Sequence, residues 1–420
     1  MSPLVIGTAI FVITYALIAS ERVDKTVAAL AGGIMMILAG IVDQEHAFEH
    51  IDFNVIFLLA GMMILAGIIR RTGVFGWMAI RAARLARGEP YRILVVLCVV
   101  TAVVSAFLDN VTTVVLIGPI TIFLAARLDI SPVPFLVAEI FASNIGGAAT
   151  LIGDPPNILI GSAANLSFIQ FINHMVPVSI VSLAAFLVGA RWLFRGYLQL
   201  EPKMREQVLN LSARETITDR LLLRKSLIVL GLTLVAFLFH GALHLEPATV
   251  ALSGAVALML WTREEAEEAL REVEWSTLFF FVGLFMLVSG VIEVGLIDLL
   301  AEGALAVTGG ALGPTAMLIL WLSAVLSAVV DNIPYTATML PLVEQLTGGP
   351  EGEFLWWTLA MGADFGGNMT IIGASANVIL AGLAAREGHP IGFWWFFKYG
   401  AIVTLGTLII CTVYVWLRYL

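Results

Sequence analysis

Charged side chains and cysteines are scarce in this sequence. Only 13% of the 420 residues are charged, two are cysteines, and the formal net charge is −9. A soluble domain is about 25% charged, so a soluble globule of this composition could not cover its surface with polar groups. The acidic balance argues against nucleic acid as a partner, and the two cysteines cannot build a disulfide framework. No G-x-x-x-x-G-K-[ST] motif occurs, which argues against ATP hydrolysis by the chain itself.

Apolar residues make up 60% of the chain and gather in long runs. A helix needs about 20 apolar residues to cross the hydrocarbon core of a membrane. The sequence therefore predicts an all-α polytopic membrane protein whose principal partner is the lipid bilayer. The ten predicted spans lie near 3–20, 26–42, 53–70, 132–152, 174–194, 226–243, 248–262, 276–292, 355–373 and 399–417.

Two further apolar stretches, 91–126 and 312–346, are each interrupted midway by an Asp-Asn pair. The pairs are Asp109-Asn110 and Asp331-Asn332, and an Asp at the centre of a bilayer costs about 2.5–3.5 kcal/mol. Irregular backbone at that depth is tolerated only where protein or a water-filled cavity covers it. We therefore predict that each stretch forms a re-entrant hairpin of two helical arms with a polar tip.

The basic residues fit this topology. With ten spans and two hairpins, 21 of the 22 Lys and Arg residues lie on one side, and only Arg418 lies on the other. The positive-inside rule makes the richer side cytoplasmic, so both termini are predicted on the non-cytoplasmic side of the plasma (inner) membrane. Residues 1–20 lack a basic leader region and are predicted to be a retained first span.

An internal repeat divides the chain. A shift of 222 residues superposes Ser105 on Ser327 and Asp109-Asn110 on Asp331-Asn332, and a shift of 220 superposes Asn157 on Asn377. The predicted organisation is a first repeat at 1–195, a cytoplasmic linker at 196–224 and a second repeat at 225–420. Each repeat holds five spans and one hairpin, and because five is odd the second copy is inverted. Inverted repeats with interrupted helices are typical of secondary transporters, which bind substrate at the repeat interface.

Each repeat also contains a Gly- or Pro-rich break in the span after its hairpin, at 143–157 and 364–377. Unwound backbone and helix ends can hold an ion or a polar solute. We expect one or more of four aspartates in these motifs to exchange the coupling proton: Asp109, Asp154, Asp331 and Asp364. The full set of candidate substrate- and ion-binding residues is Asp109, Asn110, Thr112, Thr113, Asn144, Gly153, Asp154, Asn157, Asp331, Asn332, Thr336, Asp364, Asn368, Thr370 and Asn377. Glu139, one turn before Ser143, is either a proton relay or a structural group.

The hairpin and break motifs resemble the ion transporter superfamily. The relevant segments are Leu-Asp-Asn-Val-Thr-Thr at 108–113, Ser-Asn-Ile-Gly-Gly through Gly-Asp-Pro-Pro-Asn at 143–157, and Asp-Asn-Ile-Pro-Tyr-Thr-Ala-Thr at 331–338. Within the superfamily the chain is most similar to the arsenical pump membrane protein (ArsB) and NhaD group, near the P-protein-like branch. The resemblance implies a scaffold domain and a transport domain that moves like an elevator. It also allows a homodimer and a soluble ATPase subunit as partners.

The carboxylates of Asp109 and Asp331 at the two tips limit which substrates the site could bind. They would repel a dicarboxylate unless protonated or paired, and no Lys or Arg lies in the tips or breaks. The site therefore suits a proton, a cation or a neutral polar solute. Our first hypothesis is proton-coupled efflux of arsenite or antimonite as neutral hydroxides, held by Asn and Thr groups without a thiolate intermediate. We expect no cofactor and no bound metal; the coupling ion is H⁺, with Na⁺ as the alternative.

Two other transport reactions remain open. One is sodium/proton antiport, and the other, which the charge argument disfavours, is sodium-coupled symport of a carboxylate-type anion. From other classes, a channel would conduct without stoichiometric coupling, and an intramembrane aspartyl protease would need a Gly-x-Gly-Asp motif that this sequence lacks. An enzymatic function is therefore not expected.

Overall fold

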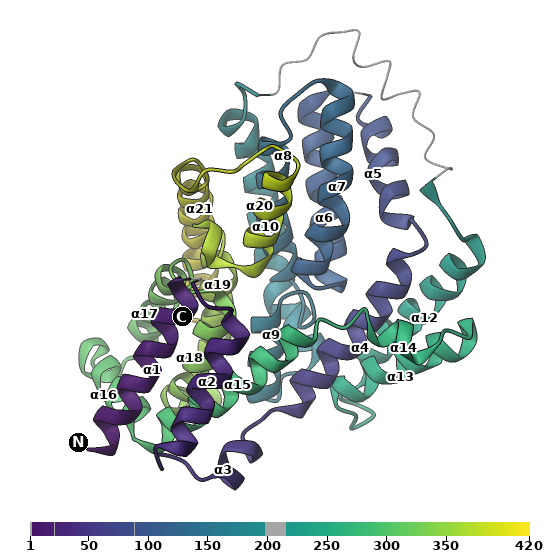
Figure 1. The fold of residues 1–420 in the computed structure, drawn as a ribbon. Coiled ribbons are helices and arrows are strands. Elements are labelled where there is room, and N and C mark those ends of the chain that lie inside the picture. Colours follow the sequence, from purple (N-terminus) through teal and green to yellow (C-terminus); the bar gives the residue numbers. More distant parts are fainter. Residues whose placement is uncertain (1, 21, 88, 198–215) are drawn as a thin grey trace.

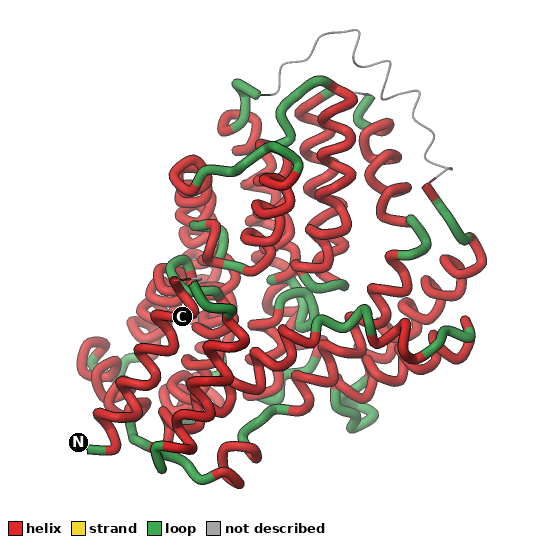
Figure 2. Tube along the Cα trace, in the orientation of Figure 1, coloured by secondary structure: helices red, strands yellow, loops and turns green. Residues whose placement is uncertain are grey.

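The computed structural model describes residues 2–20, 22–87, 89–197 and 216–420. Within these ranges every regular element is a helix and none is a strand (Figure 2). This agrees with the all-α membrane architecture predicted from composition, because a helix satisfies its backbone hydrogen bonds within one segment.

Helices occur at all ten predicted spans. They are α1 (Pro3–Ser20), α2 (Lys25–Leu38), α4 (Phe53–Arg70), α8 (Val133–Gly147), α10 (Phe168–Leu193), α12 (Arg220–Phe239), α13 (Pro247–Thr262), α15 (Trp275–Glu293), α19 (Phe354–Gly366) and α21 (Phe393–Tyr419). The hairpin arms are α6 (Pro90–Phe107), α7 (Asn110–Leu128), α17 (Leu312–Ser327) and α18 (Asn332–Thr347). The shorter elements are α3 (Gln44–Glu49), α5 (Val74–Leu85), α9 (Pro155–Ala163), α14 (Ala266–Leu270), α16 (Leu296–Thr308), η2 (Pro350–Gly352), η3 (Ile371–Gly373) and α20 (Ser375–Arg386).

The number of full-length spans is smaller than predicted. Among the described residues, eight helices are long and apolar enough to cross a membrane, or nine if the bent pair α16–α17 counts as one span. Two of the eight are α6 and α7, which we predicted as hairpin arms. The difference arises because α8 and α19 stop at unwound segments, and because α2 and α13 are only 14 and 16 residues long.

Both Asp-Asn pairs break a helix, as predicted. Leu108 is extended (φ −121°, ψ 153°), so α6 ends there, and Asp109 then accepts a hydrogen bond from the Thr112 backbone N–H at the start of α7. Asp331 caps α18 in the same way, with Ile333 as the donor. An aspartate at this position satisfies a backbone N–H that would otherwise lack a partner at the helix start.

The two hairpins lie in different parts of the molecule and are connected by the short helices of the breaks. Hairpin α6–α7 lies beside α5 and α8, whereas hairpin α17–α18 lies beside α1 and α16 (Figure 1). The short helix α9 packs against α18, and α20 packs against α7. Each break therefore contacts the hairpin of the other half of the chain.

Residues 198–215 of the predicted linker lie outside the described residues. Just after them, Thr218 donates hydrogen bonds from its backbone N–H to the Thr72 carbonyl (3.0 Å) and from its hydroxyl to the Arg71 carbonyl (2.6 Å). Helix α12 begins at Arg220, inside the range predicted as linker.

Glycines permit close helix contacts at several crossings. At the α2–α15 crossing, a Cβ on Gly283 would lie 2.4 Å from the Leu30 backbone nitrogen. That contact is with backbone, which a side-chain rotation cannot relieve. The crossing therefore requires glycine.

We expect Gly283→Val to destabilise the protein by about 1–3 kcal/mol, the usual cost of overpacking. The measurement is the thermal unfolding temperature of the purified protein in detergent. Gly231→Val is the matched control, because a Cβ at Gly231 on α12 meets nothing within 4 Å. Equal shifts in the two variants would contradict the prediction.

Candidate functional site

The site is centred on the two unwound segments, 148–154 and 367–374. Helix α8 ends at Gly147 and α9 begins at Pro155, while α19 ends at Gly366 and α20 begins at Ser375. Pro155 and Pro156 favour a new helix start, because the first turn does not need their missing N–H groups. The sequence prediction that both spans are broken here is confirmed by these helix ends.

Close backbone packing holds each break against the hairpin of its own half. A Cβ on Gly146 would lie 2.2 Å from the Ala102 carbonyl oxygen, and one on Gly366 would lie 2.5 Å from Ala324 Cα. Equivalent hydrogen bonds join the break to the hairpin in each half. The Ser105 hydroxyl donates to the Ser143 carbonyl (2.8 Å), and the Ser327 hydroxyl donates to the Ala363 carbonyl (2.7 Å).

Two asparagines brace the unwound backbone at equivalent positions. The Asn157 amide donates to the Thr150 carbonyl (3.0 Å), and the Asn377 amide donates to the Thr370 carbonyl (2.9 Å) and the Gly367 carbonyl (2.7 Å). The Thr370 hydroxyl donates to the Ala328 carbonyl at 2.5 Å. Much of the predicted polar set thus stabilises irregular backbone that a membrane interior could not otherwise accommodate.

Gly153 has a packing role of this kind. A Cβ there would lie 2.5 Å from the Gly147 carbonyl oxygen and 2.7 Å from that of Ser105. We infer that Gly153 lets the break fold back onto the hairpin.

The centre of the site is the carboxylate of Asp154, which is fully buried. The Asn110 amide donates to its Oδ2 (2.6 Å), and the Asn332 amide donates to its Oδ1 (3.3 Å). These two asparagines begin α7 and α18, so both hairpin tips bind one carboxylate. The two tips are 222 residues apart in the sequence.

A second set of amide contacts joins the breaks. Asn144 on α8 donates through its two amide hydrogens to Asn368 Oδ1 and Asn377 Oδ1, each at 3.0 Å, and accepts from the Asn110 amide at 3.2 Å. All of these side chains are buried. The two halves therefore share one continuous network of amides.

Asp364 on α19 differs from the other polar side chains at the centre in its hydrogen bonding. Both of its carboxylate oxygens are buried, and neither accepts a hydrogen bond in good geometry from the described residues, although the Asn157 side chain lies close enough to stabilise the charged carboxylate. It also interacts electrostatically with Asp154. A charged carboxylate buried in this way is costly, which makes Asp364 a candidate for holding a proton, a cation or a polar solute.

Other polar atoms in the centre also lack partners within the described chain. They are Asn110 Oδ1, Asn157 Oδ1, the Asn368 amide nitrogen, and the hydroxyls of Thr113 and Thr336. Buried polar groups are normally paired, and each exception calls for an explanation such as a bound water or ion. Asp364 and these atoms provide both donors and acceptors for a small polar ligand.

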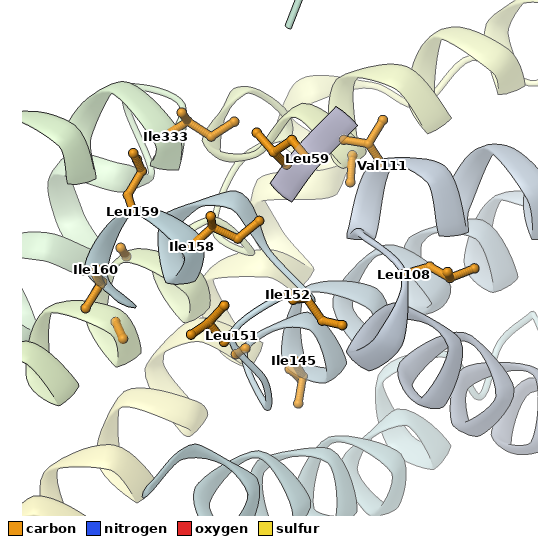
Figure 3. Close-up of a cluster of buried hydrophobic side chains, with 14 of the residues drawn as sticks. Leu59, Leu108, Val111, Ile145, Leu151, Ile152, Ile158, Leu159, Ile160 and Ile333 are labelled. Atoms are coloured by element: carbon orange, nitrogen blue, oxygen red, sulfur yellow. The ribbon is translucent and has the colours of Figure 1, made fainter. Parts of the chain in front are cut away.

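Apolar side chains surround the break between α8 and α9. Leu151 and Ile152 lie on the unwound segment, Ile158 follows on α9, and Val111 and Ile333 lie at the two hairpin tips (Figure 3). These residues separate the polar centre from its surroundings and strengthen electrostatic interactions inside it.

A cavity of about 250 Å³ lies next to the tips. It is lined by Lys25, Asp109, Glu274, Ser375, Val111 and Ile333, among others. Burial, and to a smaller extent the Asp109 carboxylate, raise the pKa of Glu274, which precedes α15. The cavity thus lies at both hairpin tips and beside Pro155, the residue after Asp154, and its lining contains two acidic residues and one lysine.

That lysine was missed in the sequence analysis. Lys25 Nζ lies 3.2 Å from Asp331 Oδ2 and donates to the Ser375 hydroxyl at 2.7 Å, and Ser375 also bonds Asp331. The tip carboxylate at 331 is thus neutralised by a residue outside the motifs. Asp109 contacts no cation in the described part of the chain and accepts hydrogen bonds from the backbone N–H and the hydroxyl of Thr112. The sequence did contain one indication that Lys25 has a specific partner. It is the first residue of an apolar helix, and the helix dipole disfavours a positive charge at the N-terminal end.

Comparison with known proteins identifies the family. The model of the family described as "Citrate transporter" (CitMHS) matches residues 15–362. The uncharacterized transporter Rv2684 of Mycobacterium tuberculosis is 48% identical over 99% of this chain and 98% of its own length. The human P protein is 35% identical over 94% of this chain, which spans 57% of that larger protein.

The fold is also that of known transporters. The Alcanivorax borkumensis YdaH transporter superposes with a TM-score of 0.62 over 99% of this chain and 98% of its own, at 15% identity. Neisseria gonorrhoeae MtrF, described as one of a class of antimetabolite efflux pumps, gives 0.61 over 99% of this chain and 95% of its own, at 12% identity.

This chain belongs to the citrate transporter family and is a multi-pass membrane transporter, not an enzyme. The predicted similarity to the P protein is confirmed, and the family match agrees with the resemblance to the ion transporter superfamily. Membership of the ArsB and NhaD group stays a prediction.

We expect Lys25→Met to destabilise the protein by about 1 kcal/mol, the upper end for a partly exposed ion pair, because it leaves Asp331 unpaired. Adding Asp331→Asn should restore most of that loss, since an amide does not need the cation. Thermal unfolding of the two single variants and the double variant measures the coupling. Strictly additive effects would contradict a direct interaction.

Proposed function

We propose that this chain is a proton-coupled secondary transporter in which Asp154 and Asp364 form the coupling site. The observation that carries the proposal is that both hairpin tips bind one buried carboxylate, Asp154, which interacts electrostatically with a second buried carboxylate, Asp364, whose oxygens accept no hydrogen bond in good geometry from the described residues. Two such groups close together are unlike surface acids, because charging both in an apolar interior is strongly unfavourable. Proton uptake and release there would accompany substrate exchange.

The partners of the four predicted aspartates indicate which of them are the better candidates for proton coupling. Lys25 pairs with Asp331, and Asp109 serves as a helix cap with Thr112. The charge of Asp331 is therefore balanced where it lies, whereas Asp109 has hydrogen-bond donors but no cationic partner among the described residues. Asp154 and Asp364 also have no cationic partner among the described residues, and Asp154, which both hairpin tips bind, interacts electrostatically with Asp364, so we assign the coupling role to these two first.

The matched contacts of the two halves support an inverted repeat in this proposal. Serine–carbonyl and asparagine–carbonyl bonds recur at equivalent positions of both breaks, and α9 and α20 each pack on the other half's hairpin. In our proposal the hairpins and breaks move together as a transport domain past α2, α4, α13 and α15. The homodimer, the ATPase subunit and the orientation with external termini stay predictions of the sequence analysis.

Our first hypothesis for the substrate is still arsenite or antimonite, transported in the form of the neutral hydroxide. Unpartnered amide and hydroxyl groups at Asn110, Asn368 and Thr336 offer hydrogen bonds to such a solute without requiring a counter-charge. The buried thiols Cys98 and Cys411 lie on separate helices, α6 and α21, which argues against thiolate capture.

A citrate-like anion is the second candidate, favoured by the family's description and by Lys25 at the cavity. An anion could replace Asp331 as the partner of that lysine. Against it, Asp109 and Glu274 line the same cavity and would repel a negative charge. Sodium/proton antiport is the third candidate, since the same carboxylates would bind Na⁺ and H⁺ in competition.

One experiment distinguishes the three candidate transport reactions. Proteoliposomes with an imposed pH gradient are supplied in turn with arsenite, citrate or Na⁺, and flux of the solute and dissipation of the gradient are both recorded. Gradient-driven arsenite movement without Na⁺ supports the first hypothesis. Citrate movement supports the second. Collapse of the gradient by Na⁺ alone supports the third.

We expect Asp154→Asn and Asp364→Asn each to abolish proton-driven flux of whichever solute is transported, because an amide cannot bind the coupling proton. Asp129→Asn is the matched control, since Asp129 is an exposed helix cap with a positive φ of 53° that asparagine also tolerates. Full proton-coupled transport by both site variants would overturn the assignment. Folding is checked by their elution as a single species in gel filtration.

A further inference from the structure

Helix α5 connects span α4 to the first hairpin and has a counterpart in the second half. Helix α5 begins after Gly73 (φ +75°), and α16, which leads into the second hairpin, begins after Gly295 (φ +74°). The two helices differ in charge. Helix α5 bears Arg81 and Arg84, whereas α16 bears Asp298 and Glu302.

A groove of about 600 Å³ runs between α5 and α6. Two of its lining residues are the arginines Arg81 and Arg84, and the remainder are apolar, including Trp77, Val96 and Val100. The guanidinium of Arg81 lies over the Trp77 ring, 5.5 Å from its centroid. The groove thus has a cationic edge and an apolar wall.

Neither arginine has an acidic partner within the part of the chain that the structure describes. By contrast, Arg70 and Arg71 at the adjoining end of α4 pair with Glu272, and Arg71 also pairs with Glu264. Glutamates therefore neutralise Arg70 and Arg71, whereas within the described residues Arg81 and Arg84 keep charges that an anionic ligand could balance.

The position of the groove in the chain fits the headgroup region of a membrane. Span α4 ends at Arg70 and hairpin arm α6 begins at Pro90, so we infer that α5, which connects them, lies near a membrane surface. Leu85 on α5 is 75% exposed, and along α6 Val99 and Val103 are exposed too. An apolar surface continues from the groove along α6 toward the hydrocarbon core.

We propose that this groove binds one anionic phospholipid, with its phosphate at Arg81 and Arg84 and an acyl chain along Val96 and Val100. A soluble anion would leave the apolar wall uncovered, and a zwitterionic lipid would leave the arginines without net compensation. The bound lipid would stabilise the connection between α4 and the first hairpin. The proposal does not depend on the substrate or on the coupling residues.

The test is native mass spectrometry of the protein purified in detergent and mixed with equal amounts of phosphatidylglycerol and phosphatidylcholine. We expect the wild type to retain one phosphatidylglycerol in preference to phosphatidylcholine. The double variant R81Q/R84Q should lose this preference by at least about fivefold, given the usual contribution of basic residues to anionic lipid binding.

Two further variants distinguish a site from diffuse attraction. R220Q/R224Q removes two exposed arginines one turn apart on α12, which do not line the groove, and should retain the preference. Val100→Trp fills the groove without changing charge and should reduce lipid binding. Equal retention of both lipids by the wild type, or equal loss in both double variants, would overturn the proposal.

Discussion

The structure of the site depends on placing one carboxylate, Asp154, in an apolar interior. Such a group needs hydrogen-bond donors, and here they come from Asn110 and Asn332 at the tips of two hairpins. The tips can reach it only because both following spans are unwound, and the unwound backbone in turn needs Asn157 and Asn377 to satisfy its carbonyls. The helix breaks, the hairpins and the amide network follow from this requirement.

The same arrangement makes the two halves mechanically dependent on each other. Asn144 binds Asn368 and Asn377 of the other half, and α9 and α20 each pack on the opposite hairpin. A movement of one hairpin would therefore carry the other with it. The ion pair between Lys25 and Asp331 joins this unit to α2, which packs on α15, so any movement of the hairpins past α2 must break it. The pair is thus a point where solute or cation binding could act on the motion.

Much of the candidate site could be predicted from residue patterns because its chemistry is local. Asp-Asn pairs within apolar stretches indicate hairpin tips, and Gly-Pro clusters within spans indicate breaks, since neither fits an uninterrupted membrane helix. Pattern reasoning was less accurate for span lengths, because a break shortens α8 and α19 by an amount that composition does not reveal. It also treated the four aspartates as equivalent, although Asp109 and Asp331 cap helices at the tips, Asp331 pairs with Lys25, and Asp154 is bound by both tips.

The sequence by itself determined the class of protein, the helical architecture and the list of polar residues, because these depend on hydropathy and on short motifs. Only the tertiary structure decided which of those residues meet. Lys25 and Asp331 are 306 residues apart, and Asn332 and Asp154 are 178 apart. Contacts of that range are set by the packing of whole helices, and no local pattern records them. The pairing of the carboxylate at the second hairpin tip, on which our proposed choice of coupling carboxylates partly rests, was therefore visible only in the fold.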